Sequence, residues 1–280
     1  MESSVRGEIS AEDYDRFCKY LESVCGITLG ANKGYLVRSR LSRIMEEAKV
    51  ASIGDLVRSL ERGVSPSLKV RVIDAMTTNE TLWFRDEYPF EILREMIFPE
   101  LGGPRAQPIR VWSSASSSGQ EPYSISITVA EHQMQRPGTL PMGVQIVATD
   151  ISASMLKQAR SGLYDDLEIN RGLSAERRMR FFTREGNKLK VRDDIRTRVD
   201  FREANLLQSF ATLGQFDAVF CRNVLIYFSH ENKRDILSRI ARTLRPRGFL
   251  FLGGSEPIAN YSNEFDMVRC PRGVVYRLNR

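Results

Sequence analysis

Residues 10–75 carry apolar side chains at the spacing of amphipathic helices. One stripe recurs every three or four positions and contains Tyr14, Phe17, Cys18, Leu21 and Val24. A second stripe of the same period contains Leu36, Val37, Leu41, Ile44, Met45 and Ala48. Such stripes bury one face of a helix against its neighbours, and the pair Ser65–Pro66 is a typical helix start. The pattern therefore predicts a small bundle of helices.

From about residue 108 the pattern changes to short apolar runs that alternate with helical stretches. The runs occupy residues 108–112, 144–150, 216–221 and 249–254. Strands that alternate with helices form parallel sheets joined by right-handed crossovers. Residues 267–279 predict two more strands around a Pro-Arg-Gly turn, and this hairpin would add an antiparallel edge. The region is therefore expected to be an α/β domain.

Between Asp165 and Arg202 the alternation of strands and helices breaks. A helical piece at 174–182 precedes the alternating segment 187–203, which predicts a small antiparallel insert with a turn at Gly186–Asn187. The window 171–202 holds eleven Lys/Arg and five Asp/Glu, so it accounts for the whole formal net charge of +6. Localised charge favours a docking surface for an acidic partner. A solvated face that maintains solubility explains it equally well.

The stretch 76–90 joins the two regions but lacks the composition of a flexible linker. It contains no Gly, its only Pro is Pro89, and four large aromatic side chains lie among its polar groups. Linkers are usually rich in Gly, Pro and Ser. The stretch is therefore a candidate for a hinge, a buried connector or the wall of a site.

Composition limits the classes of protein that fit. The chain of 280 residues is 42% hydrophobic and 27% charged, which is typical of a globular protein. It has no apolar run of the roughly 18 residues that cross a bilayer, and its N-terminus lacks the apolar region of a signal peptide, so a cytoplasmic location is expected. The four cysteines form no CxxC pair and there are two histidines, so no metal site is predicted.

Three predicted strand ends carry groups suited to ligand binding, because open α/β sheets bind ligands beyond the carboxyl ends of their strands. The first strand runs into the small residues Ser113–Gly119, the second ends at Asp150, and Asn223 and Tyr227 follow the third. Together they favour a nucleoside-containing cofactor whose ribose diol donates to Asp150. The GxGxxG spacing of NAD-binding folds is missing. An unrelated α/β domain, in which Asp150 caps the next helix, stays open on this pattern alone.

Five segments, in this order, resemble the chemotaxis receptor methyltransferases of the CheR family. They are TTNETLWFR, VWSSASSSGQEPYSISI, VATDISASMLKQARSGLY, FDAVFCRNVLIYF and LRPRGFLFLGGSE, and the likeness covers nearly the whole chain. The resemblance implies a class I S-adenosylmethionine-dependent methyltransferase: a Rossmann-like sheet with an antiparallel C-terminal hairpin, preceded by a small all-α domain. It also implies methyl transfer to glutamate side chains of chemoreceptors, which forms glutamyl methyl esters in sensory adaptation and leaves S-adenosylhomocysteine as product.

On this resemblance the chain divides into three parts. Residues 1–75 form a helical domain that recognises the receptor methylation region, and residues 76–90 form an interdomain segment that contributes to the active site. Residues 91–280 form the cofactor-binding domain, with the small β insert at about 168–202.

The resemblance also assigns roles to residues by position. The expected cofactor-binding set is Asn79, Thr81, Arg85, Glu121, Asp150, Asn205, Leu206, Asn223 and Val224. Arg85 and Tyr227 are expected at the methyl-transfer site, and whether Arg85 contacts the carboxylate of the cofactor or of the substrate is left open. Trp83 and Phe84 are expected to anchor the interdomain segment in the core. Gln120 stands where some relatives have a second acid, so Glu121 alone is expected to supply the acidic group near the amino-acid end of the cofactor.

The expected partner is the cytoplasmic domain of chemoreceptors, with no membrane insertion and no nucleic acid. Arg38, Arg40 and Arg43 are candidates for contacting an acidic substrate helix, although a solvated helix face is the rival, with Arg43 paired to Glu46 or Glu47. In some relatives the insert binds a receptor C-terminal tail. The tight turn here leaves open whether such a tail peptide, or a regulator, binds it.

Two other functions remain open from the sequence. A nucleic-acid methyltransferase would explain the high isoelectric point, but RNVLIY is not the Asn/Asp-Pro-Pro-aromatic motif usual for methylation of exocyclic amines. A non-catalytic module that binds S-adenosylmethionine and recruits partners is the second. No general base is required for the favoured reaction, because a glutamate with a pKa of about 4.3 is already ionised at neutral pH.

Overall fold

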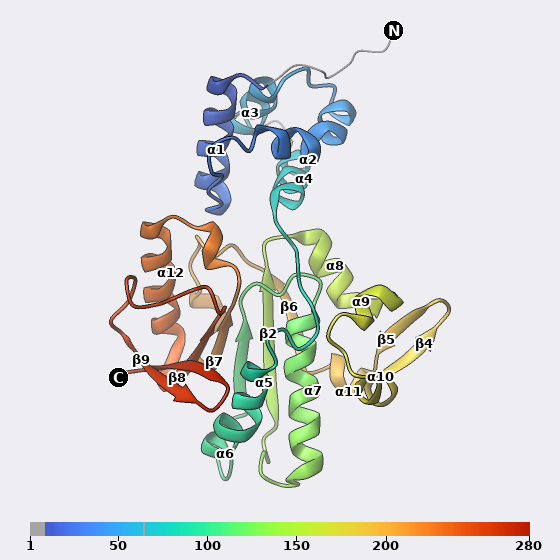
Figure 1. The fold of residues 1–280 in the computed structure, drawn as a ribbon, viewed down its shortest axis with the longest axis vertical. Helices are drawn as coiled ribbons and strands as arrows, with labels where there is room; N and C mark the ends of the chain where they lie inside the picture. The colour runs from blue at the N-terminus through green and yellow to red at the C-terminus, as the bar shows by residue number, and fades with distance from the viewer. Residues whose placement is uncertain (1–8, 64) are drawn as a thin grey trace.

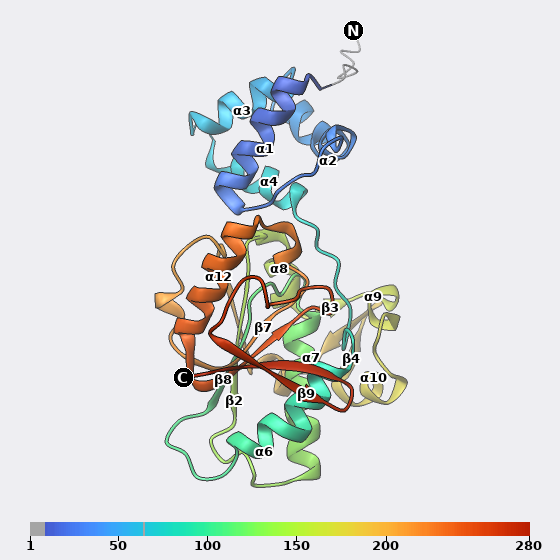
Figure 2. The same cartoon turned by 60° about the vertical axis from the view of Figure 1, so that its left-hand side comes forward.

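The computed structural model describes residues 9–63 and 65–280, and it shows a helical domain standing on one end of an α/β domain (Figure 1). An extended segment between helices α4 and α5 connects the two domains in both views (Figures 1 and 2). Residues 1–8 of the predicted helical domain, and residue 64, lie outside the described residues. In the part of the chain that is described, no helix is both long and apolar enough to cross a membrane.

The predicted bundle of helices is confirmed. Its helices are α1 Ala11–Cys25, α2 Gly34–Glu47, α3 Ile53–Glu61 and α4 Pro66–Met76. Both apolar stripes supply its core, in which Phe17, Leu21, Val37 and Leu41 are fully buried. The side chain of Ser65 accepts a hydrogen bond from the backbone N–H of Leu68, so α4 starts at the predicted Ser-Pro pair.

A seven-stranded mixed sheet forms the centre of the α/β domain. Its strands are β1 Ile109–Ser113, β2 Val144–Asp150, β6 Val199–Glu203, β7 Phe216–Cys221, β8 Leu244–Leu252, β9 Phe265–Cys270 and β10 Gly273–Leu278. Their spatial order is β6-β2-β1-β7-β8-β10-β9. The first five run parallel, while β10 is antiparallel to both of its neighbours. The predicted class I fold, with its antiparallel C-terminal hairpin, is therefore confirmed.

Helices and loops cover both faces of this sheet. On one face lie α5 Tyr88–Ile92, the π-helical turn η1 Leu93–Ile97, α6 Phe98–Leu101 and α7 Gln120–Gln135. Helix α8, Ala153–Ser161, lies beside α7, because the hydroxyl of Tyr123 donates to the carbonyl oxygen of Ala159. On the other face lie α12 His230–Thr243, the short turn η2 Ala211–Leu213 and the loop that precedes it. In central strands such as β1, β2 and β8, alternate residues thus enter opposite cores, as the period of a strand requires.

The insert differs from its prediction at both ends. A three-stranded antiparallel sheet, of order β3-β5-β4, consists of β3 Leu163–Tyr164, β4 Phe182–Glu185 and β5 Lys188–Val191. Short helices accompany it: α9 Asp166–Asn170, α10 Ala175–Phe181 and α11 Asp193–Arg196. Residues 199–203, expected in the insert, instead form β6, which pairs in parallel with β2. The prediction was wrong there because period-two alternation identifies a strand but not its partner.

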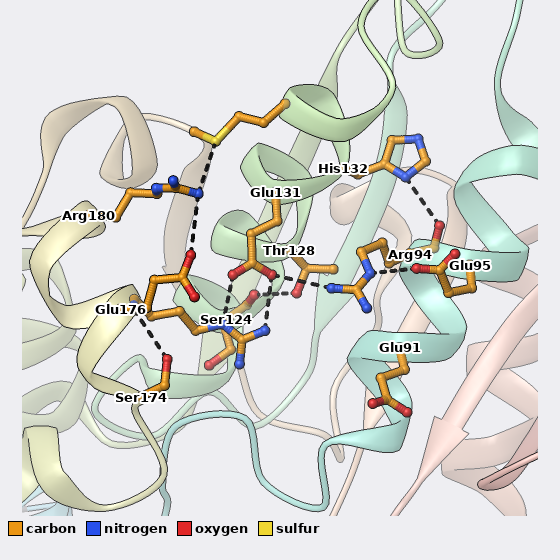
Figure 3. Close-up of polar contacts among 12 residues, drawn as sticks. Glu91, Arg94, Glu95, Ser124, Thr128, Glu131, His132, Ser174, Glu176 and Arg180 are labelled. Atoms are coloured by element: carbon orange, nitrogen blue, oxygen red, sulfur yellow. Dashed lines mark hydrogen bonds and ion pairs between the residues drawn. The ribbon is translucent and has the colours of Figure 1, made fainter.

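An ion-pair cluster centred on Glu131 of α7 joins the insert to the main domain (Figure 3). Glu131 accepts two hydrogen bonds from Arg177 of α10, at 2.7 and 3.0 Å, and lies 3.6 Å from Arg94 of η1. The guanidinium of Arg177 also stacks on Phe84, 3.6 Å from the ring centroid. Because Phe84 belongs to the interdomain segment, the insert is packed directly against that segment.

Most basic side chains of the insert have acidic partners. Pairs within the insert or with its flanks include Arg178–Asp166, Lys190–Glu185, Arg192–Asp194 and Arg196–Asp193. Arg171 pairs with Glu80 of the interdomain segment. Three acids outside the window 171–202, namely Glu80, Glu131 and Asp166, therefore offset part of its net charge of +6, which weakens the argument for an acidic partner that rested on charge alone.

Candidate active site

A pocket opens where the order of the sheet reverses. In the sheet, β2 and then β6 lie on one side of β1, and β7 and then β8 lie on its other side. Ligands of open α/β sheets bind in the crevice at such a reversal. The pocket has about 890 Å³ of space not filled by atoms, part of it open to solvent, and residues of both domains line it.

Ten of the residues predicted for the site line this one pocket. They are Asn79, Thr81, Arg85, Glu121, Asp150, Asn205, Leu206, Asn223, Val224 and Tyr227. They come from five separate segments of the sequence, and the pocket does not include Arg38, Arg40 or Arg43. The structure therefore brings together the predicted cofactor and methyl-transfer residues and separates them from the predicted substrate-binding arginines.

The interdomain segment forms one wall of the pocket. Trp83 and Phe84 are buried, as expected, while Asn79, Thr81 and Arg85 line the cavity. The backbone N–H of Trp83 donates to the carbonyl oxygen of Arg171 at 3.0 Å. The close approach requires Gly172, because a Cβ there would lie 2.0 Å from the carbonyl oxygen of Trp83. The stretch 76–90 is thus packed against the α/β domain and forms a wall of the pocket.

Asp150 holds the loop that follows β1. One carboxylate oxygen accepts from the backbone N–H of Ser117 at 2.7 Å, and the other from that of Ser152 at 2.9 Å. Burial raises the pKa of Asp150, while these N–H donors act in the opposite direction. Ser152, not Asp150, caps α8 through its side chain. The alternative in which Asp150 caps helix α8 is therefore wrong.

Glu121, in the first turn of α7, also lines the pocket. It accepts from the hydroxyl of Ser113 at 2.8 Å and from Arg222 at 3.0 Å. Burial raises the pKa of Glu121, and the positive charge of Arg222 opposes this shift most strongly among its neighbours. In its ionised form, a carboxylate in this place is suited to bind an ammonium group.

Arg222 was missed in the sequence analysis. Its side chain is 1% exposed, and it binds Glu121 at 3.0 Å, Asp86 at 2.6 Å and the carbonyl oxygen of Arg85 at 2.9 Å. It thus ties the end of β7 to both α7 and the interdomain segment. The only signal in the sequence is a charged residue directly after a continuous apolar strand, Phe216–Cys221, where a buried charge needs partners.

Replacing Arg222 by Gln should weaken binding of S-adenosylhomocysteine, the expected product, and change its pH dependence. Without its cation, Glu121 should have a higher pKa, and only its ionised form binds the ligand's ammonium group. Affinity is lost as pH falls through that pKa, so the rise of affinity with pH should occur at higher pH in the variant than in the natural protein. Calorimetric titrations from weakly acidic to alkaline pH measure this shift.

Arg105→Gln is the control for this prediction, because Arg105 binds the buried Asp217 at 2.9 Å, among the residues at the amino-terminal ends of the strands. It should leave the pH profile unchanged. Superimposable profiles for Arg222→Gln and the natural protein would contradict the role of Arg222.

The helical domain closes the apolar side of the pocket. Cys25 and Ile27, at the end of α1, line it together with Leu206 and Phe228. The side-chain amide of Asn205 donates to the carbonyl oxygen of Val24 at 2.7 Å. This side of the pocket can hold an aromatic base between apolar side chains, with Asn205 fixing the edge of the helical domain.

The segment after β7 supplies the remaining wall. Asn223 has a left-handed backbone with φ of 57°, and Tyr227 ends the short helical turn η3, Leu225–Tyr227. The carbonyl oxygen of Tyr227 accepts from the backbone N–H and the hydroxyl of Thr28, at 2.8 and 2.9 Å. Tyr227 is therefore held between the two domains.

The three predicted substrate-binding arginines lie on α2. Arg40 donates to the carbonyl oxygens of Met76 and Thr77, at 2.8 and 3.2 Å, so it satisfies the carboxyl end of α4. Arg43 is exposed and pairs with Glu47, one of the two partners considered. Arg38 is half-buried. Arg40 thus has a structural role that the sequence did not indicate.

The pocket fits S-adenosylmethionine in the chemistry of its walls. It combines an apolar end, a carboxylate at the end of β2 for a ribose and a carboxylate in α7 for an ammonium group. The hydroxyl of Ser114, which lines the pocket, is buried without a hydrogen-bond partner among the described residues. An unpaired buried hydroxyl at a pocket wall is accounted for by a polar ligand.

Comparisons with known proteins agree with this chemistry. Residues 12–77 match the family described as the CheR methyltransferase all-alpha domain, and residues 79–274 match the CheR methyltransferase SAM binding domain. The chain is 53% identical to chemotaxis protein methyltransferase 1 of Pseudomonas aeruginosa, over 95% of this chain and 97% of that protein. It is 51% identical to chemotaxis protein methyltransferase 1 of Vibrio cholerae, over 96% and 98% of the two chains. The chemotaxis protein methyltransferase of Escherichia coli is 33% identical, over 100% and 95%. The chain therefore belongs to the CheR methyltransferase family.

Proposed function

We propose that this S-adenosylmethionine-dependent chemotaxis methyltransferase esterifies glutamate side chains on the cytoplasmic helices of chemoreceptors. The observation that carries the proposal is that one pocket at the reversal of the sheet brings Arg85 and Tyr227 beside the predicted cofactor-binding residues. Because its substrate would be the cytoplasmic part of a receptor, the protein would act in the cytoplasm.

The residues that would hold the cofactor follow from the walls of the pocket. Asp150 would accept from the ribose, Glu121 would bind the ammonium group, and Asn205 and Leu206 would flank the adenine. Asn79, Thr81, Asn223 and Val224 would complete the contacts near the reacting end. When bound, S-adenosylmethionine supplies a methyl group activated by a sulfonium.

The chemistry needs alignment and exclusion of water more than proton transfer. The attacking glutamate is already a carboxylate, so no general base is required. A carboxylate that approaches a sulfonium loses charge along the reaction, and a water-poor wall favours that change. Tyr227 supplies part of such a wall, and Arg85 can orient a carboxylate by a charge-assisted pair of hydrogen bonds.

The receptor helix would enter between the two domains. Arg38 and Arg43 are the arginines of α2 whose side chains do not satisfy the end of α4, so they are the better candidates for contacting acidic groups of that helix. For the insert, the turn between β4 and β5 has only two residues, and acids outside the window 171–202 offset part of its positive charge. Binding of a receptor tail there would depend on the positive charge that remains.

The test uses the purified chain, S-adenosylmethionine with a tritiated methyl group, and receptor cytoplasmic fragments with and without their last five residues. Transfer of label that base hydrolysis releases as methanol, and that is lost when the receptor glutamates are replaced by alanine, would support glutamyl esters. Label that resists base, or that appears on nucleic acid instead, would refute the proposal. Equal rates with both fragments would exclude a tail tether.

A further inference from the structure

Glu256 is a buried carboxylate that the reaction described above does not use. It lies in the loop after β8 and is 6% exposed. One carboxylate oxygen accepts from the backbone N–H of Asn223 at 2.6 Å and from that of Gly253 at 2.7 Å. The other accepts from the backbone N–H of Ile226 at 3.2 Å. No arginine or lysine of the described residues forms an ion pair with it.

The position of Glu256 follows from the way two strands end. Strands β7 and β8 are paired up to Cys221 and Leu252, and beyond these residues the two segments are no longer paired. The backbone N–H groups of Asn223 and Gly253 lie beyond the paired residues, and a buried N–H without a partner is costly. Glu256 accepts hydrogen bonds from an N–H group after each strand, so its carboxylate holds the two strand ends together.

The groups that Glu256 binds belong to the wall of the active site. Asn223 has the left-handed backbone that non-glycine residues seldom adopt, and it lines the pocket with Val224 and Tyr227. Glu256 binds the N–H groups at the start and in the middle of this turn. Gly253 faces the same point, because a Cβ there would lie 2.6 Å from the Glu256 carboxylate and 2.7 Å from the side-chain nitrogen of Asn223.

We propose that Glu256 is a positioning residue for methyl transfer: its carboxylate fixes the turn 223–227 and thereby sets Asn223, Val224 and Tyr227 against the cofactor. This inference rests on the proposed cofactor contacts of those three residues. It does not depend on which substrate accepts the methyl group. Glu256 itself lines no part of the pocket.

The test compares variants of Glu256 in the full-length chain. In Glu256→Ala, all three backbone donors lose their partner, so the dissociation constant of S-adenosylhomocysteine should rise by about tenfold or more, since buried donors are left unpaired. Glu256→Gln retains one acceptor oxygen of the same reach and should lie between the natural protein and the alanine variant. Gly253→Ala disturbs the same contact from the other side and should also weaken binding.

The control is Asp217→Asn, because Asp217 is another buried carboxylate that accepts from a backbone N–H, that of Arg110, at 2.8 Å. It lies near the start of β7, whereas the pocket lies beyond the end of that strand. The Glu256 variants and Asp217→Asn should all melt at lower temperature than the natural protein. Only the Glu256 variants should lose affinity for S-adenosylhomocysteine when it is measured well below their melting temperatures. A positioning role also predicts that kcat with saturating cofactor falls in Glu256→Gln.

Two results would overturn the inference. One is affinity and kcat within about twofold of the natural protein in folded Glu256→Gln and Gly253→Ala. The other is an equal loss of affinity in Asp217→Asn, which would show that general destabilisation is the cause. Failure of the natural protein to methylate receptor glutamates would refute the proposed substrate only, since the binding comparison would still decide the role of Glu256.

Discussion

Arg85→Ala should reduce methyl transfer to receptor fragments by about 100-fold or more in kcat/KM, which corresponds to about 2.7 kcal/mol of transition-state stabilisation. Arg85 lines the pocket, and its side chain makes a single hydrogen bond within the described residues, to the carbonyl oxygen of Glu80 at 3.3 Å. Its loss therefore removes little that stabilises the fold. The melting temperature should hardly change, and the two measurements together identify a functional role.

Kinetics of the same variant decide what Arg85 contacts. If Arg85 binds the carboxylate of the cofactor, affinity for S-adenosylhomocysteine should fall together with activity. If it orients the substrate carboxylate, that affinity should persist while the reaction with receptor fails. Arg85→Lys keeps the charge but loses the planar fork of donors, so it should recover only part of the activity.

Arg136→Ala is the matched control, because Arg136 is an exposed arginine whose partner is Glu95, in the cluster around α7. It should retain full activity. A large fall in the melting temperature of Arg85→Ala with activity retained would instead make the interdomain segment a structural connector.

Asp150→Asn should weaken binding of S-adenosylhomocysteine by about tenfold to 100-fold, because a charged acceptor for the ribose is replaced by a neutral amide. The substitution also leaves the backbone N–H of Ser117 or Ser152 facing an amide group, so the free energy of unfolding should fall by about 1–3 kcal/mol. Calorimetry measures the first effect, and denaturant unfolding the second.

A change of ligand separates these two effects. A 2′,3′-dideoxy analogue of S-adenosylhomocysteine has no ribose diol, so it should bind the natural protein and Asp150→Asn with nearly equal affinity. If the variant loses the same factor of affinity for both ligands, the deficit comes from a distorted pocket, and Asp150 does not bind the ribose.

Both predictions concern a site that two domains complete. Asn205 is bonded to the end of α1, and Tyr227 is bonded to Thr28 just beyond it. The bundle of helices thus forms part of the pocket, in addition to any contact it makes with the receptor.

The sequence by itself determined the elements whose pattern is local. Helical stripes predicted the bundle, and the apolar runs at 144–150 and 216–221 match the bounds of β2 and β7 as the structure has them. Asp150 was correctly expected at a strand end. These features follow from neighbours a few residues apart, since the period of hydrophobic positions decides which face of an element is buried.

Only the tertiary structure decided which distant segments meet. Residues 199–203 join β2 rather than the insert, and Arg40 satisfies the end of α4 instead of standing free for a substrate. The partners of Arg222 and Glu256 are likewise chosen by where strands separate and leave polar groups buried. These contacts depend on hydrogen bonds and on the burial of polar groups between segments far apart in the chain. The periodicity within a single segment therefore cannot predict them.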